Sequence, residues 1–340
     1  DLINGMDYSL LASLAGGYLE ARTIQVAVSL GVFDALNDKK LSAPSLASSI
    51  CTDRRATELF LNALVSLGLL EKRDSLFSLT EFASIYLVHD SPKYFGDVIL
   101  FDSSLWNCWG ELEKAIRSGK PVRSPDMYQR SPQETERFIY AMRSLVRARG
   151  DAQILTETLD MSGVRELLDV GPGPGTYAIH FCRKFPKLQA TLFDLPETMK
   201  ITARSVKDSG LEDRIRLVTG DYRVDPIVGS YQMIFLSNII HAESAEENSL
   251  LMTKLNPCLE RAGKIVIKDH ILDDSLTQPP AGALFALLML LTTEHGRCYS
   301  FSEVKGWLES AGYERVSQIH LPPPLTSSLV IGEKADAHKP

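Results

Sequence analysis

Three glycines at alternate positions carry the clearest chemical signal in this chain. The apolar run 166–170 contains Asp169 and is followed directly by Gly171, Gly173 and Gly175. Glycine has no Cβ, so the backbone can turn tightly there and approach a ligand closely. A helix that starts after such a loop, expected over 177–185, directs its N-terminus at the ligand. The pattern predicts a site for a nucleotide-like cofactor, with a plain turn as the alternative.

Acidic residues follow two further apolar runs. Asp194 and Leu195 stand in F-D-L-P, and Asp221 and Tyr222 stand in T-G-D-Y. Ligands of an open parallel sheet bind beyond the carboxyl ends of its strands, which also makes the run 237–241, and Ser237 within it, a candidate. Asp194 would accept hydrogen bonds from ribose hydroxyls, and Asp221 from the adenine amine, with Tyr222 covering the ring. For each acid, capping of a helix is the alternative.

The details of these motifs favour S-adenosylmethionine (SAM) over a nicotinamide cofactor. The loop spacing is G-x-G-x-G in place of G-x-G-x-x-G, and no Arg or Lys is clustered to neutralise a pyrophosphate. SAM has no phosphate to neutralise. A nicotinamide oxidoreductase therefore remains only a weaker alternative.

The elements that must position these residues form an alternating pattern in the second half of the chain. Such alternation of strands and helices predicts an α/β fold with a mostly parallel, Rossmann-like sheet and helices on both faces. A helix is expected in each gap between strands, and a final antiparallel hairpin after a helix at 302–311. The strands are predicted at 166–170, 190–193, 215–219, 233–237, 264–269, 315–320 and 328–332.

The first half is mainly helical and contains a smaller unit that resembles a winged helix. Helices are expected at 42–50 and 53–67, with Gly68 ending the second, followed by two short strands near 69–79. A winged helix that reads DNA is one interpretation. The second helix is apolar apart from Arg54 and Arg55, which favours burial in a dimer. We expect domains at 1–160 and 161–340.

Bulk properties narrow the class of protein further. The net charge of -7 over 340 residues argues against nucleic acid or an anionic membrane as the main partner. The five cysteines include no C-x-x-C pair, so neither a disulfide framework nor a metal site is expected. The longest apolar run, 281–291, is too short to cross a bilayer. No leader opens the chain, although residues before Asp1 could be missing, and a reducing cytoplasm is the expected compartment.

The order of these motifs resembles that of the two-domain SAM-dependent small-molecule O-methyltransferases, a family that includes caffeate-type enzymes, acetylserotonin methyltransferase and bacterial relatives. The matching segments cover nearly the whole chain. They are S-L-G-L-L-E-K, L-D-V-G-P-G-P-G, F-D-L-P, G-D-Y, L-S-N-I-I-H, G-K-I-V-I-K-D and L-E-S-A-G-Y.

The resemblance implies a role for individual residues. It implies a homodimer formed through the winged-helix region, and methyl transfer from SAM to a hydroxyl of a small aromatic acceptor. His241 falls on the family's catalytic base, and Asp269 on the carboxylate that orients it. Positions that line the acceptor pocket in similar enzymes are occupied by Ile99, Leu105, Trp109, Phe138, Met142, Met289 and Thr293.

The chain also departs from the family's pattern. Ala242 and Glu243 follow His241 where family members usually have Asp-Trp, and Cys298 replaces a second orienting acid. Glu243 or Glu294 are candidates to compensate. Methylation at nitrogen, sulfur or carbon, and a non-methylating reaction on the same fold, remain alternatives.

Overall fold

The structure is a computed structural model that describes residues 8–335. The chain divides into two compact units, one ending at Trp106 and the other beginning at Asn107. The helices of 107–160 therefore belong to the same compact unit as the large sheet. The functional division near residue 160 stays a prediction.

The first unit is helical with one small sheet. Three strands pair antiparallel in the order β1-β3-β2, and the helices pack around a core that includes Phe33, Leu61 and Phe77. Asp53 accepts the Ala56 amide hydrogen bond and so caps α4, the predicted second helix. The predicted order of helix, helix and hairpin is present. The elements are α1 (Tyr8–Ser29), α2 (Val32–Ala35), β1 (Leu41–Ser42), α3 (Ala43–Ser49), α4 (Arg54–Ser66), β2 (Leu70–Arg73), β3 (Leu76–Leu79), α5 (Glu81–Tyr86) and α6 (Gly96–Ser104).

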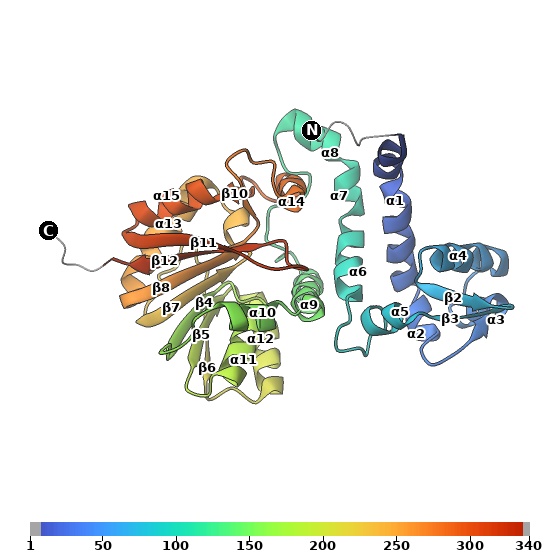
Figure 1. Cartoon of the computed structure of the whole chain (residues 1–340), viewed down its shortest axis with the longest axis horizontal. Coiled ribbons are helices and arrows are strands. Elements are labelled where there is room, and N and C mark those ends of the chain that lie inside the picture. The colour runs from blue at the N-terminus through green and yellow to red at the C-terminus, as the bar shows by residue number, and fades with distance from the viewer. Residues whose placement is uncertain (1–7, 336–340) are drawn as a thin grey trace. The chain divides into compact units, whose positions relative to one another are not determined.

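The second unit is built on a seven-stranded sheet in the order β11-β12-β8-β7-β4-β5-β6 (Figure 1). The strands from β6 to β8 run parallel, whereas β11 and β12 form an antiparallel hairpin that pairs with β8. The predicted fold class is confirmed. The strands are β4 (Glu166–Val170), β5 (Gln189–Asp194), β6 (Ile215–Thr219), β7 (Tyr231–Ser237), β8 (Leu259–Asp269), β11 (Tyr313–His320) and β12 (Ser328–Lys334).

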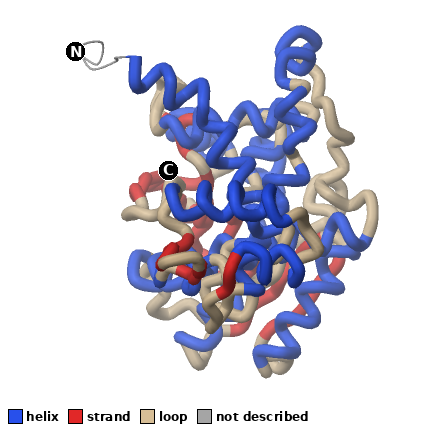
Figure 2. The backbone as a smooth tube through the Cα atoms, turned by 90° about the vertical axis from the view of Figure 1, so that its right-hand side faces the viewer, coloured by secondary structure: helices blue, strands red, loops and turns tan. Residues whose placement is uncertain are grey.

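Helices pack on both faces of this sheet, and helix is the predominant element along the backbone (Figure 2). Side chains alternate along each strand, so Leu167 contributes to the core on one face and Leu168 to the core on the other. The first face carries α9 (Pro132–Arg149), α10 (Asp151–Thr158), α11 (Thr176–Lys184) and α12 (Pro196–Ser209). The second face carries α13 (Ala245–Leu255) and α15 (Phe301–Ser310).

The remaining elements of the chain are mostly short. They are α7 (Trp106–Gly110), α8 (Leu112–Ser118), the 3-10 turns η2 (Ile240–Ala242) and η3 (Asn256–Cys258), β9 (Ile271–Leu272), α14 (Pro280–Thr292) and β10 (Tyr299–Ser300). Across residues 8–335, no helix is long and apolar enough to cross a membrane.

The expectation of a helix in every gap between strands is wrong for residues 220–230. Only turns lie between β6 and β7. Pro226 lacks an amide hydrogen, and Gly229 has φ +135°, a conformation that a helix cannot accommodate. The Asp225 carboxylate instead accepts the Asp221 amide hydrogen bond at 2.8 Å.

Candidate active site

The glycine loop between β4 and α11 has a backbone that requires glycine. Gly171, Gly173 and Gly175 have φ of +68°, +53° and +74°, values that side chains disfavour. A Cβ on Gly171 would also lie 2.3 Å from Cδ1 of Ile239. The loop is also held by α12, because Thr202 Oγ1 of that helix donates a hydrogen bond to the Gly173 carbonyl at 2.6 Å. The loop is therefore a preformed surface onto which a ligand can fit closely.

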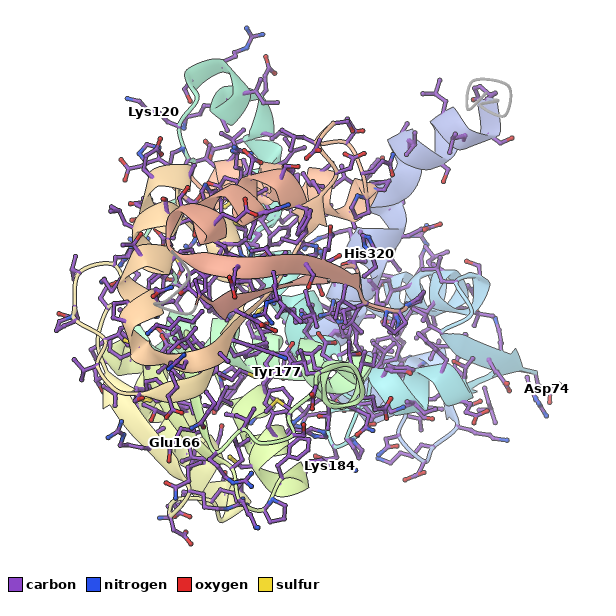
Figure 3. The ribbon with its side chains drawn as sticks, turned by 60° about the vertical axis from the view of Figure 1, so that its left-hand side comes forward. Asp74, Lys120, Glu166, Tyr177, Lys184 and His320 are labelled. Carbon is purple, nitrogen blue, oxygen red and sulfur yellow. The ribbon has the colours of Figure 1, made fainter. Side chains whose placement is uncertain are left out.

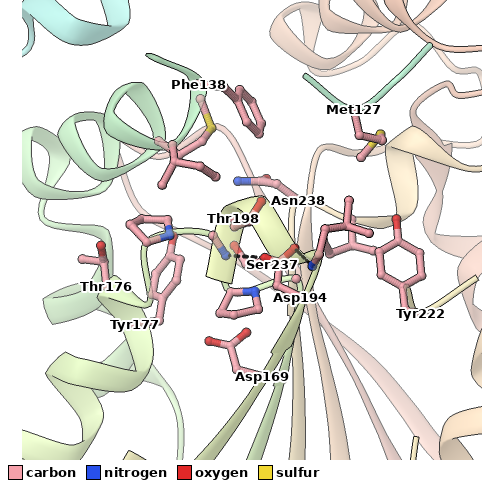
Figure 4. A pocket seen from close by; sticks show the side chains of 18 of the residues that line it. Met127, Phe138, Asp169, Thr176, Tyr177, Asp194, Thr198, Tyr222, Ser237 and Asn238 are labelled. Atoms are coloured by element: carbon pink, nitrogen blue, oxygen red, sulfur yellow. Dashed lines mark hydrogen bonds between the residues drawn. The ribbon is translucent and has the colours of Figure 1, made fainter. Parts of the chain in front are cut away.

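Asp194 ends β5 directly beside this loop (Figure 4). Its carboxylate accepts hydrogen bonds from the Gly173 amide at 3.0 Å and from the Leu195 amide at 2.7 Å. Burial raises the pKa of Asp194 to about 6, although these two hydrogen bonds oppose the shift. The carboxylate is thus held in one orientation at the edge of the pocket.

Asp169 carries a buried carboxylate with unused hydrogen-bonding capacity. The residue is 1% exposed, and its Oδ2 atom has no hydrogen-bond partner within the described chain. Burial, and then the nearby charge of Asp194, raise the pKa of Asp169 well above its usual range. An orphaned buried acceptor that lines a pocket fits a ligand that brings a donor or a positive charge.

Asp221 is paired in a way that the sequence did not reveal. Arg223 donates to both of its carboxylate oxygens, with Nε at 2.9 Å and Nη2 at 2.8 Å. These hydrogen bonds hold the pKa of Asp221 below its usual range. The sequence shows no cluster of Arg or Lys to neutralise a pyrophosphate, and one paired arginine does not form such a cluster. Arg223 lines the pocket, but Asp221 already neutralises it.

One pocket, with about 970 Å³ of empty space that is partly open to solvent, joins these parts. It brings together the predicted residues Asp169, Gly171, Gly173, Asp194, Leu195, Asp221, Tyr222, Ser237, Phe138 and Met142. Gly175 shapes the loop without lining the pocket. Sequence reasoning missed Met127, Gln129, Ile139 and Thr198, which also line it. Asn238 and Ile239 line it too, and they belong to the run after β7 that the sequence had marked as a candidate.

His241 lies in η2, shortly after β7 ends, and is next to Asp269, the last residue of β8. His241 Nδ1 and Asp269 Oδ1 are 2.7 Å apart, and the two residues are 9% and 1% exposed. The His270 amide donates to the same Oδ1 atom at 2.7 Å. Burial alone would raise the pKa of Asp269, but the His241 charge and hydrogen bond outweigh it and hold the pKa below its usual value.

Neighbouring elements restrain the imidazole. The Phe285 ring of α14 meets it edge-on, with centroids 4.8 Å apart. Asn248 Nδ2 donates to the Ile240 carbonyl at 2.8 Å, and Tyr299 Oη to the Glu243 carbonyl at 2.6 Å. A Cβ on Gly296 would lie 2.4 Å from the His241 carbonyl oxygen. The turn that carries His241 is thus closely packed on several sides.

Neither candidate for a second orienting acid contacts His241. Glu243 accepts a hydrogen bond from Tyr222 Oη at 2.6 Å, and the Glu294 side chain is 74% exposed. Burial, and then the charge of Asp269, raise the pKa of Cys298 to about 12. Cys298 is therefore a neutral thiol, and Asp269 is the carboxylate that is hydrogen-bonded to the His241 imidazole.

The remaining predicted acceptor residues do not line the pocket. Met289 and Thr293 belong to the α14 segment that packs on the His241 turn, where Thr293 Oγ1 accepts the Gly296 amide hydrogen bond at 3.0 Å. Trp109 lies in α7 and is 40% exposed. Ile99 and Leu105 are buried residues of the first unit.

Comparison with known proteins agrees with this geometry. The O-methyltransferase domain matches residues 109–314, and the O-methyltransferase dimerisation domain matches residues 12–89. A 3-hydroxy-5-methyl-1-naphthoate 3-O-methyltransferase of Streptomyces sahachiroi is 30% identical over 335 residues, covering 96% of this chain and 95% of that relative. An L-tyrosine C(3)-methyltransferase of Streptomyces lavendulae is 26% identical, covering 98% of this chain and 93% of the relative.

The solved structures include the same fold. The crystal structure of human N-acetylserotonin methyltransferase in complex with SAM superposes with a TM-score of 0.88 at 24% identity, covering 98% of this chain and 99% of that one. The fold and site define a SAM-dependent methyltransferase. The chain belongs to the O-methyltransferase family, whose two characteristic domains it carries in order.

Proposed function

We propose that this enzyme transfers the methyl group of SAM to a hydroxyl of a small aromatic acceptor, with His241 as the general base and Asp269 as the carboxylate that orients it. The observation that carries the proposal is the buried 2.7 Å contact between His241 Nδ1 and Asp269 Oδ1. His241 follows closely after Ser237 and Ile239 in the chain, and both of these residues line the cofactor pocket.

The pocket residues fit SAM better than a dinucleotide. Within the described chain, Arg223 is the only Arg or Lys that lines the pocket, and Asp221 pairs with it. No free cation is left there for a pyrophosphate. Asp194 would accept from the ribose, and the orphaned Oδ2 of Asp169 would face a positively charged group. When bound, SAM supplies a methyl group already activated on a sulfonium.

The protein's own groups then have two tasks. Because Nδ1 of His241 is hydrogen-bonded to Asp269, Nε2 is the ring nitrogen that would take the proton from the hydroxyl of the methyl acceptor. Asp269 fixes that tautomer and stabilises the imidazolium that forms. Phe138 stacks on Tyr128 with ring centroids 4.5 Å apart, and with Met142 it gives the pocket an apolar wall that favours a flat aromatic ring.

The test uses methyl-labelled SAM, a panel of hydroxylated aromatics and the His241→Gln variant. Base catalysis contributes about 100-fold or more, so the variant should lose at least that factor in kcat. Its SAM affinity by calorimetry should stay near the original value. A loss of only a few fold would mean that alignment alone accounts for the rate.

Carbon methylation is the second candidate, because one relative is named as a methyltransferase acting at C(3) of L-tyrosine. A phenol activated by His241 as its phenolate is reactive at ring carbon as well as at oxygen. Product NMR separates the two outcomes. The signal of a methyl group on oxygen would support O-methylation, whereas the signal of a methyl group on a ring carbon would support C-methylation in its place.

We further propose that the enzyme is a homodimer through its first unit. Residues 12–89 match the dimerisation domain, and α1 exposes Leu11, Leu14 and Tyr18 by 64%, 69% and 59%. Such an apolar stripe is typical of an interface. Sedimentation of Leu14→Glu should show a monomer, whereas an unchanged mass would contradict this interface. A cytoplasmic location stays a prediction, supported by five free cysteines.

A further inference from the structure

A second pocket of the same unit shares a wall with the cofactor pocket. Val146, Pro174 and Thr176 line both, but the second pocket opens between α9, α10, α11 and α12 and contains about 900 Å³ of empty space, partly open to solvent. Nothing in the methyl-transfer mechanism uses it. Figure 3 shows the course of α11, from Tyr177 in the interior to Lys184 at the periphery.

The lining of this second pocket is strongly basic. Arg143 and Arg147 come from α9 and Arg183 comes from α11, and in the described part of the chain no carboxylate lies within ion-pair distance of any of the three. Arg147 and Arg183 are exposed, and Arg143 is partly buried. Partial burial, and then the positive charges of Arg143 and Arg183, lower the pKa of Arg147, as expected for three cations that line one pocket. This local excess of positive charge stands in a chain of net charge -7.

Hydrogen-bond donors accompany the three arginines. Ser205 presents a hydroxyl from α12, whereas the Ser209 hydroxyl already donates to the Val206 carbonyl at 2.6 Å. Nε2 of His180 is buried without a hydrogen-bond partner in the described chain. Asp208 is the only acid among the described lining residues. Converging guanidinium and hydroxyl groups match the oxygens of a phosphate group, which arginine can bind through two parallel hydrogen bonds.

We propose that this pocket is a binding site for a phosphate group, either inorganic phosphate or the phosphoryl group of a small organic ester. Two or three guanidinium groups would neutralise the dianion and lose their mutual repulsion. The Ser205 hydroxyl would donate one further hydrogen bond to the phosphate. Asp208 would oppose binding and so set an upper limit on affinity.

The experiment is calorimetric titration of the full chain, saturated with S-adenosylhomocysteine, with inorganic phosphate and separately with phenyl phosphate. We expect binding to persist in the presence of S-adenosylhomocysteine. Arg147→Gln and Arg183→Gln should each weaken it about tenfold, the loss of one charge-assisted hydrogen bond. Arg183→Lys, which keeps the charge and the fold, should weaken it less. Asp208→Asn should tighten binding severalfold.

Lys207→Gln is the matched control, because this lysine is exposed on the same helix as Asp208 but does not line the pocket. It should change affinity less than twofold. Equal binding of both ligands identifies free phosphate as sufficient, and binding of the ester alone identifies an organic phosphate. Absence of binding to either ligand, displacement by S-adenosylhomocysteine, or an equal effect of Lys207→Gln would overturn the proposal. The experiment measures phosphate binding and not methyl transfer. Its result therefore does not depend on whether the proposed methyl-transfer function is correct.

Discussion

Replacing Asp269 with asparagine removes one negative charge beside His241 and leaves the local hydrogen bonds nearly unchanged. Oδ1 of the new side chain can still accept from His241 Nδ1 and from the His270 amide. Its amide nitrogen would take the place of Oδ2, an atom that has no hydrogen-bond partner in the described chain. The variant therefore isolates the charge of the carboxylate from its role as an acceptor.

The expected magnitude follows from this geometry. The N–O distance is 2.7 Å, which places the centres of the two charges about 4 Å apart, and such a pair interacts by about 4 kcal/mol at an effective dielectric constant near 20. If the imidazolium is largely formed in the transition state, losing this charge–charge interaction lowers kcat about 1000-fold.

The assay is kcat for Asp269→Asn at saturating acceptor and SAM, with the SAM dissociation constant measured by calorimetry as the control. The double variant with His241→Gln should be no slower than His241→Gln alone, because the two residues act as one unit. A loss below about tenfold in Asp269→Asn would refute the reasoning, since it would show that little charge develops on His241.

Three further predictions concern the cofactor site, the base and the buried charges. The pKa of Asp194 is raised to about 6, and binding of the ribose needs the ionised carboxylate. SAM affinity should therefore be highest above pH 6 and fall about tenfold per pH unit below it, whereas the Asp194→Asn variant should bind SAM weakly at every pH. Gly296→Ala should reduce kcat at least tenfold by displacing the base, whose carbonyl oxygen would lie 2.4 Å from the new Cβ; Gly306→Ala, with nothing within 4 Å, is the matched control. Asp151→Asn should lower the free energy of unfolding by about 3 kcal/mol or more in urea titrations, because Lys268 is 1% exposed and loses its carboxylate partner. Lys268→Met should cost less, because Asp151 keeps its arginine partner, and equal costs would contradict this asymmetry.

Local sequence patterns were sufficient for most elements of the fold. β4 and β6 have the predicted bounds because each is a short apolar run between clear turn signals. Both predicted helices of the winged-helix unit also appear, and the Ser42 and Asp53 side chains accept the hydrogen bonds that cap them. The gap at 220–230 was predicted wrongly because its turns depend on one proline and one glycine in an otherwise ordinary stretch.

The partners of the polar side chains were less accessible to sequence reasoning. Asp221 is expected to accept a hydrogen bond from adenine, and the sequence did not show that Arg223 also donates to both of its carboxylate oxygens. Glu243 was a candidate for orienting His241, yet it faces Tyr222. A carboxylate can reach several neighbours from one backbone position, and only packing selects among them.

The sequence by itself determined the order of strands and helices, the glycine loop and the residue types at the strand ends. These features depend on backbone conformation and on periodicity, which neighbouring residues control. The tertiary structure decided which of those residues meet. His241 and Asp269 are separated by 28 positions and come within hydrogen-bond distance because β7 and β8 are adjacent in the sheet. The basic pocket beside the glycine loop likewise exists only because four helices converge there.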